Sequence, residues 1–231
     1  MQLSLPVLLP DDETFQNFMT GDNALLVAHL ENLLTPENQS PSITYISGES
    51  GSGKSHLLYA LCARGGETGC WVSYFDFNQA REWSVDALAG LEGCDIVCLD
   101  NVHALTGLHE WQVAVFDLIN RVTESGHARL IITGDAGPAL LTLELPDLKS
   151  RLSWGMSFTV QKLSENDSIA MLINRAKVRG LTLPDEVAQF MLSRGKRDAR
   201  SLINALNKLD QLSLQQQRKL TIPFVKQALE L

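Results

Sequence analysis

Short apolar stretches alternate with helical patterns over the first 160 residues. Residues 42–47, 70–77, 95–100, 128–135 and 154–160 are rich in β-branched and aromatic side chains, and each predicts a strand. Apolar positions at helical spacing occur at 23–34, 54–63, 85–91 and 111–122. The run 95–100 is continuously apolar, as in a strand that is buried on both faces. The alternation of strands and helices favours an α/β fold, with a doubly wound parallel sheet of about five strands and helices on both faces.

After residue 161 the strand patterns stop. Helical spacing continues at 164–179, 184–194, 198–212 and 223–229. Ser164 with Asp167 resembles a capping box, and Pro184 suits a first helical turn. We therefore expect three parts, namely an N-terminal tail over 1–10, an α/β domain over 11–161 and a small helical domain over 162–231.

Charge changes sign along the chain. Of the 231 residues 45% are apolar and 20% are charged, which excludes a disordered or fibrous protein. Residues 1–148 hold 5 basic and 20 acidic residues, a balance of −15, whereas residues 149–231 hold 14 and 7, a balance of +7. The net charge of −8 alone argues against contact with DNA, but the two halves must be considered separately.

Nothing in the sequence predicts a membrane or secreted protein. No run approaches the ~18 apolar residues of a membrane helix. The apolar start lacks the basic region of a signal peptide, since Lys54 is the first basic residue. The four cysteines have neither metal-site spacing nor the density of a disulfide-rich domain, and Cys98 lies in an apolar run. We expect a cytoplasmic protein with reduced thiols and no membrane partner.

The strongest motif follows the first predicted strand. Residues 48–55 read G-E-S-G-S-G-K-S, which fits the phosphate-binding pattern G-x-x-x-x-G-K-[ST] between a strand and a helix. Backbone N–H groups and the helix N-terminus surround phosphates in such a loop. Lys54 would reach the outer phosphates and Ser55 would ligate Mg²⁺; a Gly/Ser turn that ends in Lys-Ser by chance is the alternative. The expected nucleotide contacts are Gly48, Glu49, Ser50, Gly51, Ser52, Gly53, Lys54, Ser55 and His56.

A carboxylate ends the third predicted strand. Asp100 lies where parallel sheets bind ligands, so we expect it to hold Mg²⁺ through water; a cap of the next turn is the alternative. Asn101 follows, where many nucleotide hydrolases of this fold carry Asp or Glu. Because an amide cannot accept a proton from water, we expect Asn101 to line a site that binds ADP or ATP but hydrolyses it weakly or not at all.

With these motifs and a helical C-terminal domain, the chain resembles the AAA+ ATPases, specifically the clade of the bacterial initiator DnaA, over nearly its full length. Residues 14–23 resemble the opening of that clade's ATPase domain, which implies that Phe18 and Asn23 lie near the nucleotide base. Residues 131–135 resemble the sensor I strand, which implies that Asp135 senses the outer phosphate. The chain ends with the lid, so we expect no DnaA-type DNA-binding domain.

Two arginines receive roles from the same resemblance. Residues 145–155 resemble the segment that carries the arginine finger, which makes Arg151 the catalytic candidate, acting on a partner's nucleotide. Residues 197–202 resemble the sensor II helix of the lid, which makes Arg200 a further nucleotide contact. From their neighbours alone, both would be ordinary solvated or salt-bridged residues, Arg200 with Asp198 for example.

The N-terminal tail carries a second diagnostic pattern. It resembles the pentapeptide by which replication proteins dock on the bacterial sliding clamp, in Gln2, Leu3, Ser4, Leu5 and Pro6. Such a peptide places leucines in an apolar pocket, and Pro6 favours an extended Leu5. An apolar tail packed on its own domain is the alternative. Together the features resemble the DnaA-homologous factors that inactivate the initiator.

The resemblance implies a regulator of replication initiation. Docked on the clamp, and so associated with the nucleoid, it would present Arg151 to ATP-bound DnaA, stimulate hydrolysis there and prevent re-initiation. DNA would be near mainly through the clamp, and AAA+ modules, including copies of this chain, would associate head to tail. The chain would be an activator and not itself an enzyme. An autonomous AAA+ ATPase or a helicase-loader ATPase stays open, the second requiring a helicase-binding segment before the module.

Overall fold

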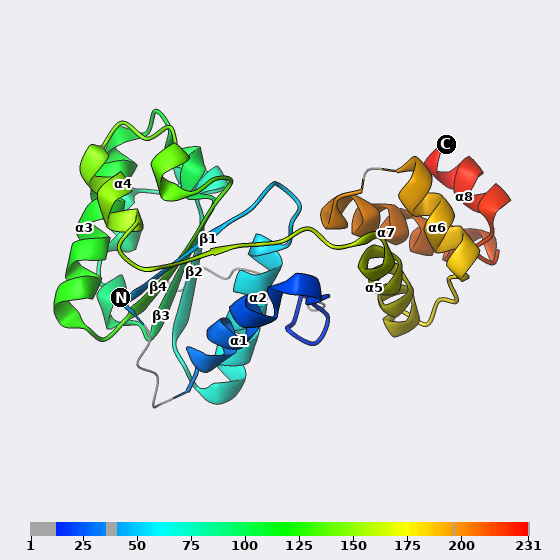
Figure 1. The fold of residues 1–231 in the computed structure, drawn as a ribbon, viewed down its shortest axis with the longest axis horizontal. Coiled ribbons are helices and arrows are strands. Elements are labelled where there is room, and N and C mark those ends of the chain that lie inside the picture. Colours follow the sequence, from blue (N-terminus) through cyan, green and yellow to red (C-terminus); the bar gives the residue numbers. More distant parts are fainter. Residues whose placement is uncertain (1–12, 36–40, 196, 231) are drawn as a thin grey trace. The chain divides into compact units, whose positions relative to one another are not determined.

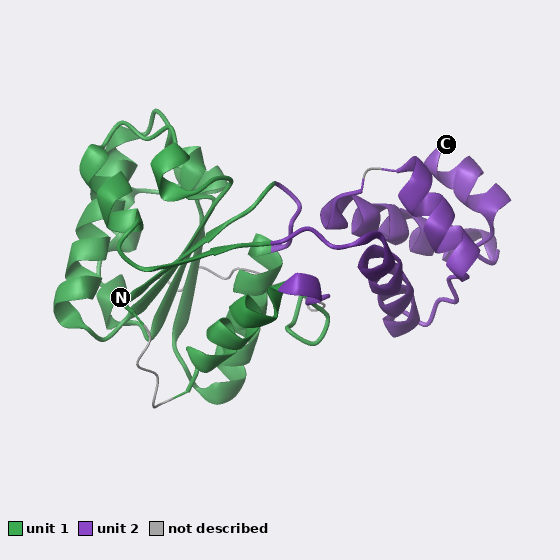
Figure 2. Ribbon diagram, in the orientation of Figure 1, with its two compact units in different colours: residues 1–18, 23–49, 54–160 green, residues 19–22, 50–53, 161–231 purple. Residues whose placement is uncertain are grey.

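A computed structural model describes residues 13–35, 41–195 and 197–230 (Figure 1). The tail over 1–10, with its clamp-binding pentapeptide, lies outside the described residues. The chain divides into two compact units (Figure 2). Unit 1 holds the residues up to Phe18, Asn23–Glu49 and Lys54–Val160, and unit 2 holds Met19–Asp22, Ser50–Gly53 and Gln161–Leu231.

Unit 1 is built on a parallel sheet of five strands, in the order β2-β3-β4-β1-β5. The strands are β1 (Ile43–Ser47), β2 (Val72–Asp76), β3 (Ile96–Asp100), β4 (Arg129–Gly134) and β5 (Met156–Thr159). Asp76 pairs with Asp100 and Ser47 with Gly134, so the carboxyl ends of the strands meet at one edge. All five predicted strands and the predicted α/β fold class are confirmed.

Helices cover both faces of this sheet (Figure 1). They are α1 (Ala24–Asn32), α2 (Lys54–Thr68), α3 (His109–Ser125) and α4 (Pro146–Leu152). Alternate residues of a strand point to opposite faces. Accordingly Ile96 and Cys98 pack in one core with α1 and α2, whereas Val97 and Leu99 pack in another with α3 and α4. The central strands β1, β3 and β4 are therefore buried on both sides, as their continuous apolar runs require, whereas the edge strand β5 is largely exposed.

Several boundaries differ from the predicted ones. The predicted helix over 85–91 is instead two short 3₁₀ helices, Val85–Leu88 and Leu91–Gly93, separated by an extended Ala89 and by Gly90 with a left-handed φ of 78°. Helix α2 continues beyond 63 to Thr68; within it a Cβ on Gly65 would lie 2.3 Å from a methyl group of Val72, so this position requires glycine. Helix α4 has no counterpart among the predicted elements.

The α-helices that the structure describes in unit 2 are α5 (Glu165–Val178), α6 (Asp185–Arg194), α7 (Ala199–Gln216) and α8 (Ile222–Leu229). They enclose a core of their own, which includes Leu172, Leu206 and Phe224. Ser164 caps α5, since its Oγ accepts the Asp167 N–H at 3.1 Å and donates to the Asp167 carboxylate at 2.7 Å. Pro184 is the N-cap of α6 and not a first-turn residue, which corrects the prediction.

The remaining general predictions concern thiols, metals and membranes. All four cysteines are free, and Cys94 and Cys98 are buried. Over the described ranges, no three or more His, Cys, Asp or Glu side chains gather as a metal site. No helix in the same part of the chain is long and apolar enough to cross a bilayer.

Candidate functional site

The phosphate-binding motif forms the turn between β1 and α2. Gly51 and Gly53 have φ values of 77° and 106°, which side-chain-bearing residues rarely adopt. Helix α2 begins at Lys54, whose side chain is only 6% exposed. Its Nζ donates to the carbonyl oxygens of Gly48 at 2.6 Å and Glu49 at 2.9 Å. The loop backbone therefore folds around the ammonium group, which lies buried within the motif.

One hydroxyl in the loop has no partner. Ser52 Oγ is buried without a hydrogen bond to any residue that the structure describes. Leaving a buried hydroxyl unsatisfied costs about 1–3 kcal/mol, so a ligand atom at this position would be favoured. Together with the buried Lys54 and the helix N-terminus, this orphaned atom fits an anionic ligand such as a phosphate chain.

Asp100 is fully buried at the end of β3. Its Oδ2 accepts a hydrogen bond from Tyr74 Oη at 2.9 Å, and its Oδ1 accepts one from Thr133 Oγ1. Tyr59 Oη lies 3.2 Å from Tyr74 Oη, so a chain of hydroxyls joins α2 to the carboxylate. Burial, together with the charge of Asp100, raises the pKa of Tyr74 and keeps its hydroxyl a donor. Hydroxyl groups thus fix the orientation of the carboxylate.

Thr133 is a site residue that the sequence interpretation missed. It is fully buried near the end of β4, donates to Asp100 and accepts the Asn101 N–H at 2.9 Å. Asp135 is half-exposed, and its Oδ1 lies 3.9 Å from His103 Nδ1. The structure therefore brings Thr133 against Asp100, whereas the sensing role of Asp135 stays a prediction. The sequence signal that could have identified Thr133 is its hydroxyl group within the otherwise apolar run of β4.

Asn101 is held by a second carboxylate at the same edge of the sheet. It has a left-handed φ of 61°, and its Nδ2 donates to Asp76 Oδ1 at 2.8 Å. The same oxygen accepts the backbone N–H of Asn78 at 3.0 Å. Asp76 ends β2 opposite Asp100, a position that only the strand register reveals. The amide of Asn101 is therefore oriented toward β2.

The segment before α1 contacts the first turn of α2. The rings of Phe18 and His56 lie 5.3 Å apart between centroids, and His56 Nε2 lies 2.8 Å from the carbonyl oxygen of Thr14. Asn23 is buried at the start of α1. The structure thus brings Phe18 and His56 together beside the motif, and their contact with a nucleotide stays a prediction.

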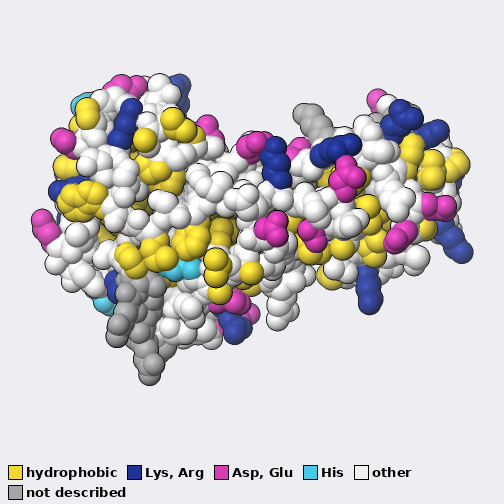
Figure 3. All heavy atoms as spheres, in the orientation of Figure 1, with side chains coloured by type: hydrophobic (Ala, Val, Ile, Leu, Met, Phe, Trp, Pro, Cys, Tyr) yellow, Lys and Arg dark blue, Asp and Glu magenta, His cyan; other side chains and the backbone are white. Residues whose placement is uncertain are grey.

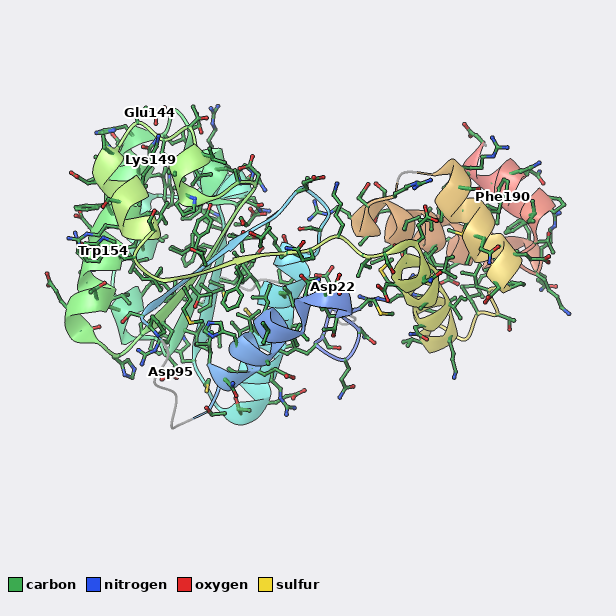
Figure 4. All side chains as sticks on the ribbon, viewed as in Figure 1. Asp22, Asp95, Glu144, Lys149, Trp154 and Phe190 are labelled. Carbon is green, nitrogen blue, oxygen red and sulfur yellow. The ribbon has the colours of Figure 1, made fainter. Side chains whose placement is uncertain are left out.

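Arg151 lies in the last turn of α4. Its guanidinium carbon is 3.8 Å from the centroid of the Trp154 ring and 5.7 Å from that of Phe116 on α3. Within the described ranges it has no ion pair, so the salt-bridge alternative does not hold there. Trp154 is 59% exposed and lies at the outer side of unit 1 (Figure 4). The half-buried planar cation is therefore stacked on an exposed ring, and it has no carboxylate partner among the described residues.

Arg200 lies in the first turn of α7 and is exposed. Its neighbour Asp198 caps that helix by accepting the Ser201 N–H at 2.8 Å, while Arg197 pairs with Glu165 at 2.8 Å. Arg200 has no ion pair among the residues whose placement is described. Its assignment as a nucleotide contact stays a prediction.

Two protein families match this chain, each over a different part. Residues 9–159 match the family described as the bacterial DnaA ATPase domain, and residues 165–229 match the one described as the Hda lid domain. The first match covers the phosphate-binding loop, Asp100 and Arg151, and the second covers Arg200.

Solved structures share the fold. Domain III of the Thermotoga maritima replication initiation protein DnaA is 22% identical with a TM-score of 0.82, over 96% of this chain and 97% of that one. AMPPCP-bound DnaA from Aquifex aeolicus is 21% identical with a TM-score of 0.73, over 89% and 67%. The Thermotoga maritima RuvB Holliday junction branch migration motor is 14% identical with a TM-score of 0.70, over 96% and 72%.

Proposed function

Because the chain belongs to the family of the bacterial DnaA ATPase domain and carries a lid of the Hda family, we propose that it regulates replication initiation by stimulating ATP hydrolysis in DnaA. Arg151 acts as an arginine finger supplied in trans. The observation that carries this proposal is the stack of the half-buried Arg151 on the exposed Trp154 ring, without a carboxylate partner in the described residues. A guanidinium in this state can offer its N–H groups to the phosphoryl oxygens of another molecule.

The chain's own loop binds ADP or ATP. The buried Lys54, the unpartnered Ser52 hydroxyl and the N-terminus of α2 fit a phosphate chain, and a relative from Aquifex aeolicus is AMPPCP-bound. Ser55 and Asp100 would hold Mg²⁺, the carboxylate through water; a bound Mg²⁺ would neutralise phosphate charge there. Tyr74 and Thr133 keep the Asp100 oxygens oriented for this purpose.

Hydrolysis at this site is slow. Asn101 stands where a carboxylate would activate water, and its amide cannot accept a proton. Its Nδ2 already donates to Asp76, which orients the side chain toward β2. The bound nucleotide therefore serves the structure of the module, and the catalytic contribution is the arginine given to the partner.

A finger supplied in trans accelerates hydrolysis by about 10³–10⁵, or roughly 4–7 kcal/mol of the barrier. DnaA in its ADP form would then not restart initiation. The pentapeptide Gln2–Pro6, outside the described residues, would hold the chain on the clamp and thereby on the nucleoid in the cytoplasm.

Replacement of the finger tests the proposal. Arg151→Ala should reduce stimulated hydrolysis of ATP by DnaA about a thousandfold or more, in the presence of clamp loaded on DNA. Nucleotide and clamp binding should survive, and the purified chain alone should turn over ATP slowly. Lys149→Ala, which removes a neighbouring cation from α4, is the matched control and should stimulate normally. Full stimulation by Arg151→Ala would falsify the finger assignment.

The tail is tested separately. Leu3→Ala combined with Leu5→Ala should abolish binding to the clamp, because the apolar pocket loses both leucines. The circular dichroism spectrum and melting temperature should stay unchanged. Leu8→Ala with Leu9→Ala removes the same apolar bulk outside the pentapeptide and should leave clamp affinity intact. Equal clamp affinities of the two double variants would contradict the assignment of Gln2–Pro6 as the clamp-binding peptide.

A further inference from the structure

The turn after α4 holds Trp154 on the same side as Arg151. The Ser153 N–H donates to the Ser150 carbonyl at 3.1 Å, and the Trp154 N–H donates to the Arg151 carbonyl at 3.1 Å. These i to i+3 bonds tighten the end of the helix and bring the side chains of residues 151 and 154 onto one face. The 3.8 Å separation between the guanidinium carbon and the ring centroid follows from this turn.

The backbone on both sides of Trp154 is fixed. Leu152 is fully buried in the core of unit 1, which anchors the chain before it. After it, Gly155 passes so close to β1 that a Cβ would lie 2.0 Å from the carbonyl oxygen of Ile43. The indole therefore projects from a rigid turn, and its position does not depend on its own burial.

Trp154 nevertheless contributes little to that core. It is 59% exposed and is not among the apolar side chains packed in the core with α3 and α4. Its ring contact within the described residues is Arg151. Figure 4 shows it at the outer side of unit 1. A large exposed aromatic ring on a rigid turn, stacked on an arginine that has no ion pair within the described part of the chain, calls for an explanation other than stability.

We propose that Trp154 is a positioning residue of the arginine finger, an inference that rests on the proposed function. The indole face attracts the guanidinium and holds it flat, because tryptophan is the strongest cation–π partner among the side chains. Stacking engages the face of the cation and leaves the N–H groups in its plane free. A carboxylate would hold the arginine equally well but would consume those donors. The finger is thus ordered before the partner's nucleotide arrives.

A substitution series at position 154 tests this in the full chain, with ATP-bound DnaA and clamp loaded on DNA. Trp154→Phe keeps an aromatic face and should stimulate within about threefold of the wild type. Trp154→Leu and Trp154→Ala should lower the maximal stimulated rate at least tenfold. The concentration for half-maximal effect should change little, since the lost contribution acts in the transition state. Trp71→Ala, at another exposed tryptophan, is the matched control and should behave as wild type.

The stack itself has a readout that does not need DnaA. In the wild-type chain, the indole ring current should shift the Arg151 Nε–H proton resonance, and Trp154→Leu should remove most of that shift, since the Phe116 ring is farther away. Normal stimulation by Trp154→Leu, or a loss in Trp154→Phe as large as in Trp154→Leu, overturns the positioning role. If Arg151→Ala abolishes stimulation and Trp154→Ala does not, this inference fails and the proposed function stands. If Arg151→Ala stimulates fully, both fail.

Discussion

At the scale of single residues, the environment of Asp100 is set by hydroxyl groups. Tyr74→Phe removes the donor to its Oδ2 while retaining the ring, and leaves a buried carboxylate oxygen short of a partner. We expect the free energy of unfolding to fall by about 1–3 kcal/mol, measured by urea denaturation at neutral pH. In the wild-type chain, the raised pKa of Tyr74 keeps its hydroxyl neutral, and therefore a donor, at neutral pH.

Tyr59→Phe is the control for that variant. Tyr59 is only partly buried and contacts Asp100 indirectly through Tyr74, so its hydroxyl should contribute less than about 1 kcal/mol. Equal losses in both variants would mean that the hydrogen bond between the two hydroxyls, which lie 3.2 Å apart, carries the contribution, and not the bond to the carboxylate.

The residues that the sequence revealed and those it missed differ in kind. Lys54 and Asp100 could be predicted because each occupies a fixed place in a contiguous motif. Asp76 and Thr133 act across neighbouring strands, and only the register of β2, β3 and β4 brings them to the site. The contact of Trp154 with Arg151 could be found only from the geometry of the turn after α4, a helix that the sequence did not predict.

At the scale of elements, the strands were the most predictable part of the fold. The central strands β1, β3 and β4 carry apolar runs that burial on both faces explains, whereas the edge strand β5 is largely exposed. Local backbone geometry was harder to predict from the sequence. Ala89 and Gly90 separate two 3₁₀ helices within residues 85–93, and α4 is too short for periodicity although Leu148 and Leu152 anchor it.

The junction between α4 and β5 should be sensitive to a single methyl group. Gly155→Ala would place a Cβ 2.0 Å from the backbone carbonyl oxygen of Ile43, and neither backbone can move without disturbing the pairing of β1 with β5. We expect a loss of more than about 2 kcal/mol in the free energy of unfolding, measured by urea denaturation. Gly137→Ala, where nothing lies within 4 Å of the added Cβ, should change it by less than about 0.5 kcal/mol. Similar stabilities would contradict the close approach.

At the scale of the whole molecule, charge follows the division of the chain. The balance is −15 over residues 1–148 and +7 over residues 149–231. In the space-filling view, Lys and Arg side chains stand out over unit 2 (Figure 3). Opposite net charges on the two parts of the chain would favour the proposed head-to-tail stacking with another AAA+ module, and the basic lid is the proposed place of any direct contact with DNA.

This charge separation predicts that association with DnaA depends on ionic strength. Exposed charges are screened beyond about 10 Å at 0.1 M salt, so raising the salt from about 50 to 300 mM should weaken binding severalfold, mainly through a slower association rate. Surface plasmon resonance with immobilised ATP-bound DnaA would measure both rates. Lys208→Glu with Lys219→Glu, two exposed lid positions, should reduce the salt dependence along with the association rate. Arg151→Ala should leave that dependence nearly unchanged, because one charge contributes little to the long-range field. An association rate that changes neither with salt nor with the lid substitutions would show that short-range contacts alone direct the encounter.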